Sequence, residues 1–217
     1  RETVEALVVR GADQSEVLAN LVRGLALDTG NQIDEFIVQD VRSNLLGLPL
    51  DLAVLNIARG RDTGIPSLNE TRQQLHDAGV SILTPYTSWL DFESNINNKL
   101  SAVNFMAAYG THEAITSAAT AAEARDAALL LRLGDGDDSD GVTIRGVTYS
   151  NEDRLAFLNG TGAYDAANGR GGVDTIDLWI GGLAEKRPEF GSAMLGQTFN
   201  YVFEFQMEQL QFGDRFY

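Results

Sequence analysis

The spacing of apolar residues along the chain predicts a mainly α-helical fold. In several segments apolar residues recur every three or four positions, which places them on one face of a helix. The segment over 34–46 shows this clearly, because Ile33, Ile37, Val41 and Leu45 stand at four-residue steps. We expect helices over these ranges: 14–28, 34–46, 51 onward, 67 to about 78, 91–108, 120–134 and 194–210.

Short polar motifs predict where two of these helices begin. Ser67 directly follows Pro66 and stands three residues before Glu70, and Thr120 stands three residues before Glu123. In such a capping box the hydroxyl and the acidic side chain bond backbone N–H groups that the first helical turn leaves without partners. We therefore expect Ser67 and Thr120 to be N-caps.

The segment over 194–210 carries bulky apolar residues on two adjoining faces, so we expect this helix to be largely buried. The residues that form these faces are Leu195, Phe199, Val202, Phe203, Met207 and Leu210. Such a helix needs neighbours on both sides. Trp89 and Trp179 are also expected in the core.

The helix that starts at Asp51 sets polar side chains among apolar ones. Leu52, Leu55, Asn56 and Arg59 stand at i, i+3, i+4 and i+7, so all four share one stripe. Burying an amide without a hydrogen bond costs roughly 2–7 kcal/mol in an apolar reference state. We therefore expect Asn56 and Arg59 to have buried partners, although their spacing alone also allows a helix cap or a contact between helices.

The composition is that of a folded chain rather than a disordered one. The chain has 217 residues, of which 44% are hydrophobic, enough for a sizeable core. Its net charge of −15 argues against nucleic acid and anionic membrane as partners, because both would repel it. It contains no apolar run near the roughly 20 residues that span a bilayer. It contains no cysteine, which excludes disulfides and thiolate metal sites.

Three blocks of sequence, in this order, resemble the animal-type haem peroxidases of the peroxidase–cyclooxygenase superfamily. Residues 51–72, DLAVLNIARGRDTGIPSLNETR, resemble the signature LNxxRxRDHGLPxYNxxR. Residues 176–185, IDLWIGGLAE, are similar to the element IDLWVGGLAE, and residues 199–217 resemble a C-terminal helix that ends in DGDRFW or DGDRFY. The strings YGTH at 109–112 and FLNGTGAY at 157–164 look like those of the bacterial, secreted branch of the family.

This resemblance implies roles for four residues of the first block. Asn56 matches the asparagine that accepts a hydrogen bond from the second ring nitrogen of the proximal histidine, and Arg59 matches the arginine that pairs with a haem propionate. Leu52 and Leu55 match side chains that pack near the proximal face of the haem. The resemblance thus implies haem b as the cofactor.

Three neighbouring positions complete the comparison with the signature. Arg61 and Asp62 match a charged pair that we interpret as structural, and each must find its partner elsewhere because adjacent helical residues diverge. Thr63 stands where the family usually has histidine. This difference puts any role of that side chain in doubt but leaves Asn56 and Arg59 intact.

The histidines that serve the haem in this family precede the asparagine motif. In this chain the two histidines, His76 and His112, both follow it, and neither matches a haem ligand by position. We expect His76 to be exposed and His112 to form a local hydrogen bond. We therefore interpret residues 1–217 as the C-terminal part of one haem peroxidase domain, whose partner is the upstream part of the same domain.

The resemblance implies that the assembled domain reduces hydrogen peroxide and oxidises a small electron donor or a halide, in a secreted, extracellular protein. An enzyme is therefore expected only when the chain is joined to the upstream part. Two alternatives stay open: the fold persists as a scaffold or adhesion module that no longer binds haem, or the chain is a calcium-stabilised binding module.

An irregular insert is expected over 111–172, because in the family's commonest form the YG string runs almost directly into the IDLW element. Its loop GDGDDSDG offers carboxylates at the spacing that calcium requires, and the candidate ligands are Asp135, Asp137 and Asp140. Asp140 stands where an EF-hand loop needs glycine, so a solvated acidic turn is the alternative. A β-hairpin is expected over 142–149.

Overall fold

The computed structural model describes residues 13–27, 30, 32–43, 45, 47–134, 136, 141–188 and 193–215. The chain divides into two compact units, Arg1–Gln32 and Ile33–Tyr217. Helix α2, Gln14–Leu27, lies in the first unit and agrees with the helix expected over 14–28. All other elements belong to the second unit.

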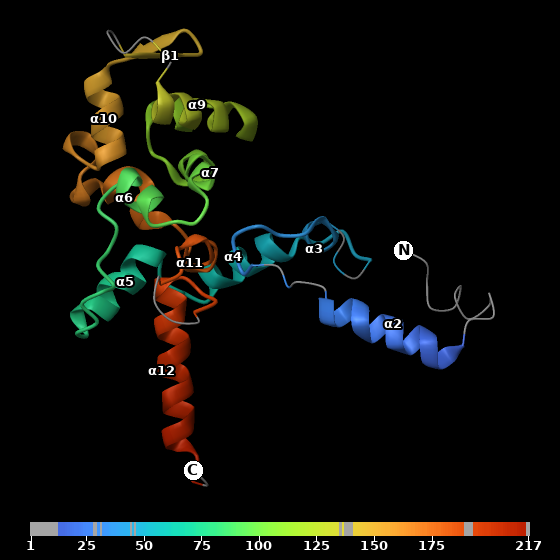
Figure 1. Ribbon diagram of the computed structural model, residues 1–217. Helices are drawn as coiled ribbons and strands as arrows, with labels where there is room; N and C mark the ends of the chain where they lie inside the picture. The colour runs from blue at the N-terminus through green and yellow to red at the C-terminus, as the bar shows by residue number, and fades with distance from the viewer. Residues whose placement is uncertain are drawn as a thin grey trace. The chain divides into compact units, whose positions relative to one another are not determined.

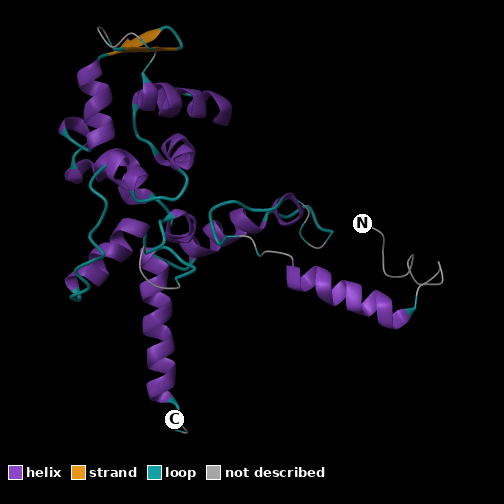
Figure 2. Ribbon diagram, in the orientation of Figure 1, coloured by secondary structure: helices purple, strands orange, loops and turns teal. Residues whose placement is uncertain are grey.

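The second unit is mainly helical, and its two short strands form one hairpin (Figures 1 and 2). The mainly α fold class and the hairpin expected over 142–149 are thus confirmed, with Val142 paired to Tyr149 and Ile144 to Val147. In chain order the elements are α3 (Gln39–Arg42), α4 (Leu52–Asp62), α5 (Leu68–Asp77), α6 (Trp89–Ser94), α7 (Lys99–Tyr109), α8 (Glu113–Thr116), α9 (Ala121–Leu133), β1 (Val142–Ile144), β2 (Val147–Tyr149), α10 (Asn151–Asn159), the 3₁₀ segments Gly162–Tyr164 and Ala166–Thr175, α11 (Leu178–Ala184) and α12 (Gln197–Gly213).

The expected helix starts are confirmed by their capping bonds. The Ser67 hydroxyl accepts from the backbone N–H of Glu70 at 3.1 Å, and the Thr120 hydroxyl accepts from that of Glu123 at 3.2 Å. Asp51 caps α4, because its carboxylate accepts from two backbone N–H groups of the first turn. These local signals act within four residues, so they can be read from the sequence.

Two helix predictions were wrong in extent. The helix expected over 34–46 is reduced to the four residues of α3, and the Asp34 carboxylate instead accepts from the backbone N–H of Phe36 at 2.9 Å, a local bond that competes with helix formation. The helix expected over 91–108 is two helices. Between them Ile96 forms a β-bridge with Glu185, which draws the chain out of helical conformation.

The hydrophobic core lies among α6, α7, α9, α10 and the hairpin. Trp89 is fully buried, as expected, and its indole N–H donates to the Gly171 carbonyl at 3.0 Å. Gly172 follows at a φ of +107°, and a Cβ there would lie 1.9 Å from the Tyr109 carbonyl oxygen, so glycine is required. These contacts hold the segment before α11 against the end of α7.

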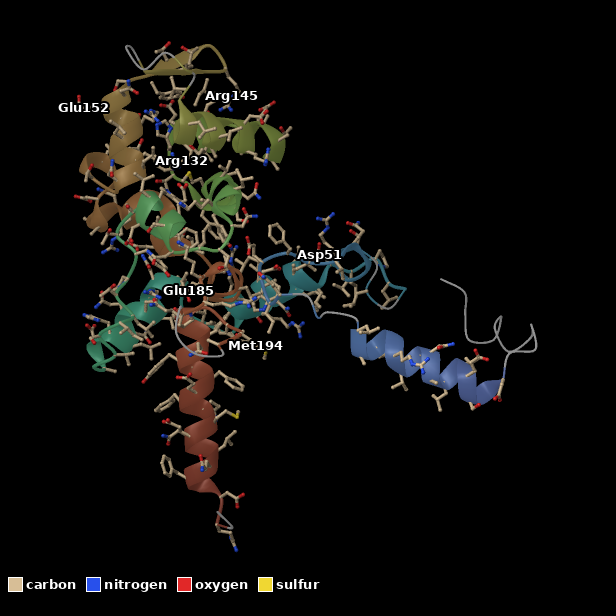
Figure 3. All side chains as sticks on the ribbon, in the orientation of Figure 1. Asp51, Arg132, Arg145, Glu152, Glu185 and Met194 are labelled. Carbon is tan, nitrogen blue, oxygen red and sulfur yellow. The ribbon has the colours of Figure 1, made fainter. Side chains whose placement is uncertain are left out.

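The expectation that the last helix is largely buried was wrong. In α12 Thr198 is the buried residue, and its large apolar side chains after the first turns are exposed (Figure 3). Phe199 packs on Gly182 of α11, where a Cβ would lie 2.7 Å from the ring. The large apolar side chains of the remaining turns are exposed: Val202, Phe203, Phe205, Met207, Leu210 and Phe212.

Candidate functional site

Helix α4 carries the residues that the sequence singled out, and its ends are well defined. Asp51 caps its start, and Thr63 follows its last residue. The Thr63 hydroxyl donates to the carbonyl of Arg59 at 2.8 Å, so this side chain helps to close the helix. Gly64 then turns the chain with a φ of +73°, a conformation that favours glycine.

The polar pair of the stripe is less buried than expected. Leu52, Leu55 and Asn56 are half-buried, whereas Arg59 is exposed, and α4 has no fully buried residue. The partners are also local, because Arg59 Nη2 donates to Asn56 Oδ1 at 3.3 Å and Arg59 Nε donates to the Leu55 carbonyl at 3.3 Å. Within the described residues, this pair is therefore bonded along its own helix.

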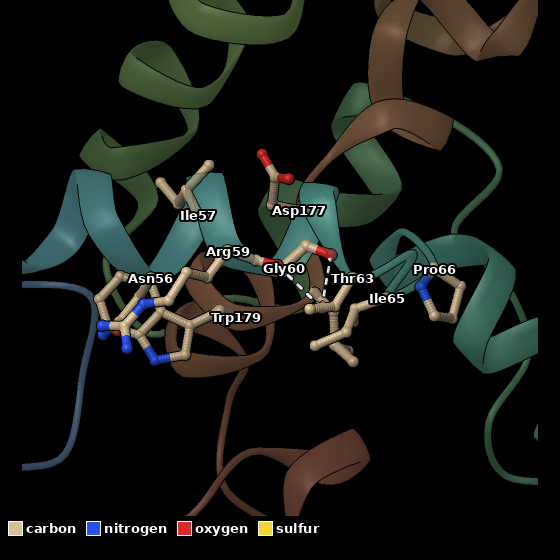
Figure 4. Close-up of a pocket in the computed structure, with 10 residues that line it drawn as sticks. Asn56, Ile57, Arg59, Gly60, Thr63, Ile65, Pro66, Asp177 and Trp179 are labelled. Carbon is tan, nitrogen blue, oxygen red and sulfur yellow. Dashed lines mark hydrogen bonds between the residues drawn. The ribbon is translucent and has the colours of Figure 1, made fainter.

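Asn56 and Arg59 border a cavity of about 360 Å³ between α4 and the start of α11 (Figure 4). Its lining residues are Asn56, Ile57, Arg59, Gly60, Thr63, Ile65, Pro66, Asp177, Leu178 and Trp179. The structure thus brings two of the four predicted haem-contacting residues to one cavity, whereas Leu52 and Leu55 are not among its lining. Trp179, expected in the core, is half-buried on the cavity wall.

Asp177 belongs to this site, and the residue-level prediction missed it. Its carboxylate accepts from Arg61 Nε at 2.9 Å and Nη2 at 2.6 Å, and from the Tyr109 hydroxyl at 2.7 Å. Burial disfavours the charged form, but these hydrogen bonds outweigh it and hold the pKa of Asp177 below its usual value. The separate partner expected for Arg61 is therefore Asp177, in the block IDLW.

The residue types around the cavity fit an apolar group that carries a carboxylate. Ile57, Ile65 and Trp179 supply apolar walls, and the exposed guanidinium of Arg59 offers N–H donors beyond the two it uses within α4. The Asp177 carboxylate is already paired with Arg61, so its repulsion of another anion is reduced. Haem, with its flat apolar ring and propionates, is such a group.

His112 is buried and both of its ring nitrogens have partners within the described part of the chain. His112 is fully buried, its Nδ1 accepts from the backbone N–H of Ala114 at 3.0 Å, and its Nε2 lies 2.9 Å from Asp153 Oδ2. Burial lowers the pKa of His112, although Asp153 and Glu113 act in the opposite direction. The expected local hydrogen bond of His112 is confirmed.

Two other predicted features have different outcomes. His76 is half-buried rather than exposed. The calcium candidates Asp135, Asp137 and Asp140 lie outside the described residues, so their metal binding stays a prediction. Among the residues that are described, no three His, Asp or Glu side chains group as a metal site, and no helix is long and apolar enough to cross a membrane.

Comparison with known proteins gives one family. The family model for animal haem peroxidases matches residues 6–125 and 164–217, well over half of the chain. The chain is 27% identical over 203 residues to Peroxinectin A of Dictyostelium discoideum, across 91% of this chain and 24% of that protein. It is 25% identical over 168 residues to the Peroxidasin homolog pxn-2 of Caenorhabditis elegans, across 77% of this chain and 8% of that protein. No solved structure matches the chain significantly.

The matched ranges contain both walls of the cavity, α4 and the start of α11, and leave out residues 126–163, within the expected insert. The chain spans about a quarter or less of the length of these two relatives. The match supports a peroxidase type of function and implies haem as the cofactor at the level of the family. The resemblance inferred from the three sequence blocks is thus confirmed, and the chain belongs to the animal haem peroxidase family.

Proposed function

We propose that residues 1–217 form the C-terminal part of a haem-dependent peroxidase domain and supply contacts on the proximal side of its haem b. The observation that carries this proposal is the cavity between α4 and α11, where Arg59 and Asn56 stand beside apolar walls. When bound, haem supplies the redox chemistry by which hydrogen peroxide is reduced and a small donor or halide is oxidised.

Arg59 would hold a haem propionate. Its guanidinium is exposed at the cavity and can form charge-assisted hydrogen bonds with a carboxylate. The bond to Asn56 along the helix restricts the Arg59 side chain before any ligand arrives. Less side-chain freedom is then lost when the propionate binds.

Asn56 would accept a hydrogen bond from the ring N–H of the proximal histidine. Its Oδ1 already accepts from Arg59 Nη2, and an amide oxygen can accept two hydrogen bonds. A neutral amide takes no proton from imidazole, so this contact would fix the tautomer of the histidine without removing the proton. Arg59 and Asn56 would thus act on the same cofactor from one helical turn.

The upstream part of the same domain is the proposed partner of this chain. The exposed apolar side chains of α12 support this, because a helix with so much exposed apolar surface is usually covered by another protein surface. We also propose, from the resemblance to the bacterial secreted branch, that the protein is extracellular. Nucleic acid and anionic membranes are not proposed as partners, because the net charge is −15.

The visible absorption spectrum of the purified protein, recorded with the intact masses of its chains before and after haem is added, tests the cofactor. A Soret band in a particle that includes the upstream part supports the proposal. If no band appears even with added haem and the upstream part present, the proposal is wrong, and the scaffold or adhesion function takes its place.

Two variants test the assigned contacts. Arg59→Gln and Asn56→Ala should each weaken haem binding by about 10–100-fold, the loss typical of a hydrogen bond to a charged group or of an outer-shell contact. Arg125→Gln is the matched control, because Arg125 is also exposed and its Nε donates to an asparagine, Asn104, at 3.0 Å, but it does not line the α4 cavity. Equal haem affinities in Arg59→Gln and Arg125→Gln would contradict the role of Arg59.

A further inference from the structure

Helix α4 is held to the rest of its unit by few contacts. It has no fully buried residue, and its main contacts within the described elements are with α11 and α3. Burial of apolar side chains therefore does not fix the rotation of α4 as firmly as it fixes a core helix. The position of Asn56 and Arg59 must depend on more specific contacts.

The Arg61–Asp177 ion pair is such a contact. Both Nε and Nη2 of Arg61 donate to the carboxylate, each to a different oxygen, at 2.9 and 2.6 Å. This two-point geometry restricts direction as well as distance. The Asp177 side chain is 15% exposed, so water competes less for it than in a surface pair, although Arg61 itself is 63% exposed.

The Asp177 side chain pairs with Arg61 and does not cap the start of α11. Asp177 is the N-cap residue of α11, yet its side chain accepts no capping hydrogen bond from that helix. Asp51 and Asp165 stand at N-caps too, and each of them accepts from two backbone N–H groups of its own helix. The carboxylate of Asp177 is turned instead toward Arg61 on α4 and Tyr109 on α7.

The backbone around Asp177 is itself fixed. The Leu68 N–H donates to the Ile176 carbonyl at 2.8 Å, and Ser67 and Asp177 form an isolated β-bridge. The Tyr109 hydroxyl donates to Asp177 Oδ2 at 2.7 Å from a helix that lies in the core. Contacts with other elements thus hold Asp177 in place, and its ion pair with Arg61 ties α4 to that position.

We infer that Asp177 is a positioning residue that sets the placement of α4, and with it Asn56 and Arg59, at the haem cavity. It acts on α4 through its ion pair with Arg61. The haem part of this inference rests on the function proposed above. The control of α4 by Asp177 can be measured without haem.

The first measurement is hydrogen exchange of the backbone amides in the full-length protein without haem. Asp177→Asn should increase exchange in α4 by about threefold or more, with little change in α7 and α9, because an amide cannot form the two-point ion pair. Asp174→Asn is the matched control, since Asp174 also accepts from one arginine, Arg170, and one neutral donor, Asn69, away from α4. Unchanged exchange in α4 of Asp177→Asn would overturn the inference.

The second measurement is haem affinity, followed by titration of the Soret absorbance. Asp177→Asn should weaken binding about 10-fold, the loss typical of outer-shell contacts. If Asp177 acts through Arg61, its replacement should have little further effect in an Arg61→Ala background. If the losses of Asp177→Asn and Arg61→Ala added up in the double variant, the inferred route through Arg61 would be overturned.

The results separate the inference from the function on which it rests. Faster α4 exchange with wild-type haem affinity in Asp177→Asn, while Arg59→Gln weakens binding, would reject Asp177 as a positioning residue for haem and leave the proposed function standing. Wild-type haem affinity in Arg59→Gln would reject the proposed propionate contact, whereas faster α4 exchange in Asp177→Asn would still support the control of α4 by Asp177.

Discussion

Replacing Glu185 by alanine should destabilise the chain by about 3–5 kcal/mol, because it would leave the Arg72 guanidinium buried without its charged partner. Arg72 and Glu185 are 2% and 1% exposed, and Arg72 Nη1 donates to Glu185 Oε1 at 2.9 Å. The same oxygen accepts from the Tyr86 hydroxyl at 2.9 Å and from the Thr198 hydroxyl at 2.8 Å. Glu185 Oε2 accepts from the Thr198 backbone N–H at 2.7 Å.

The isosteric change Glu185→Gln separates the charge from the shape. Both oxygens of Glu185 are surrounded by donors, so the NH₂ group of a glutamine would face another donor in either orientation. One buried donor would lose its acceptor, which costs about 1–3 kcal/mol, and the charge of Arg72 would also lose its counter-ion. Gln should therefore destabilise the chain clearly, though less than Ala.

Urea and thermal unfolding, followed by far-ultraviolet circular dichroism, measure the loss of stability in Glu185→Ala and in Glu185→Gln. For a chain of this size, 3–5 kcal/mol corresponds to a fall in Tm of about 6–20 °C. Glu208→Ala, an exposed change on α12, is the control and should shift stability by less than about 0.5 kcal/mol. If Glu185→Ala lost less than about 1 kcal/mol, the pair could not be buried and bonded as described; if that variant fails to fold, Glu185→Gln carries the test.

Three local features of the chain have measurable consequences. Burial lowers the pKa of His112 in the folded chain below the value of about 6.5 expected for an unfolded histidine. Stability should therefore fall as the pH drops below about 6.5, because the unfolded chain binds the proton more readily, and His112→Gln should flatten the urea-midpoint profile in that range. Gly182→Ala should cost about 1–3 kcal/mol by pushing on Phe199, whereas Gly24→Ala meets open space and should not destabilise the chain, as Tm values would show. If the acidic loop binds calcium, EGTA should lower the Tm of the wild type but not of a variant with asparagine at the candidate ligands, Asp135, Asp137 and Asp140. An unchanged wild-type Tm would reject calcium binding.

The helix starts and the hairpin could be predicted because their causes are local. Ser67 and Thr120 bond N–H groups three residues away, so their effect is visible in a short window of sequence. The break between α6 and α7 could not be predicted in this way. It depends on the pairing of Ile96 with Glu185, which lies far along the chain, and no periodicity of apolar residues reports such a contact.

In the candidate site, too, the sequence predicted local relations between residues but not contacts between distant parts of the chain. Asn56 and Arg59 stand one helical turn apart, so their common face follows from the helix itself. The sequence also indicated that Arg61 needs a separate partner, but the identity of that partner, Asp177, depends on the fold, because 116 positions separate the two residues. The exposure of side chains was harder to predict. The apolar stripe on α4 and the apolar faces of α12 both predicted buried helices, but within the described residues both are largely half-buried or exposed.

The segment 126–163, which lies outside the family match, contributes to the hydrophobic core. Residues 126–163 have no counterpart in the family match, yet they supply fully buried side chains such as Phe157 and Leu131. The ring of His112, from the matched part, stacks on Tyr164 and meets Phe157 and Tyr149 edge to face, with ring centroids 5.3 and 4.9 Å away. The described residues of this segment join the same core and do not line the cavity between α4 and α11, so their packing can enlarge the core without disturbing the residues that we propose contact haem.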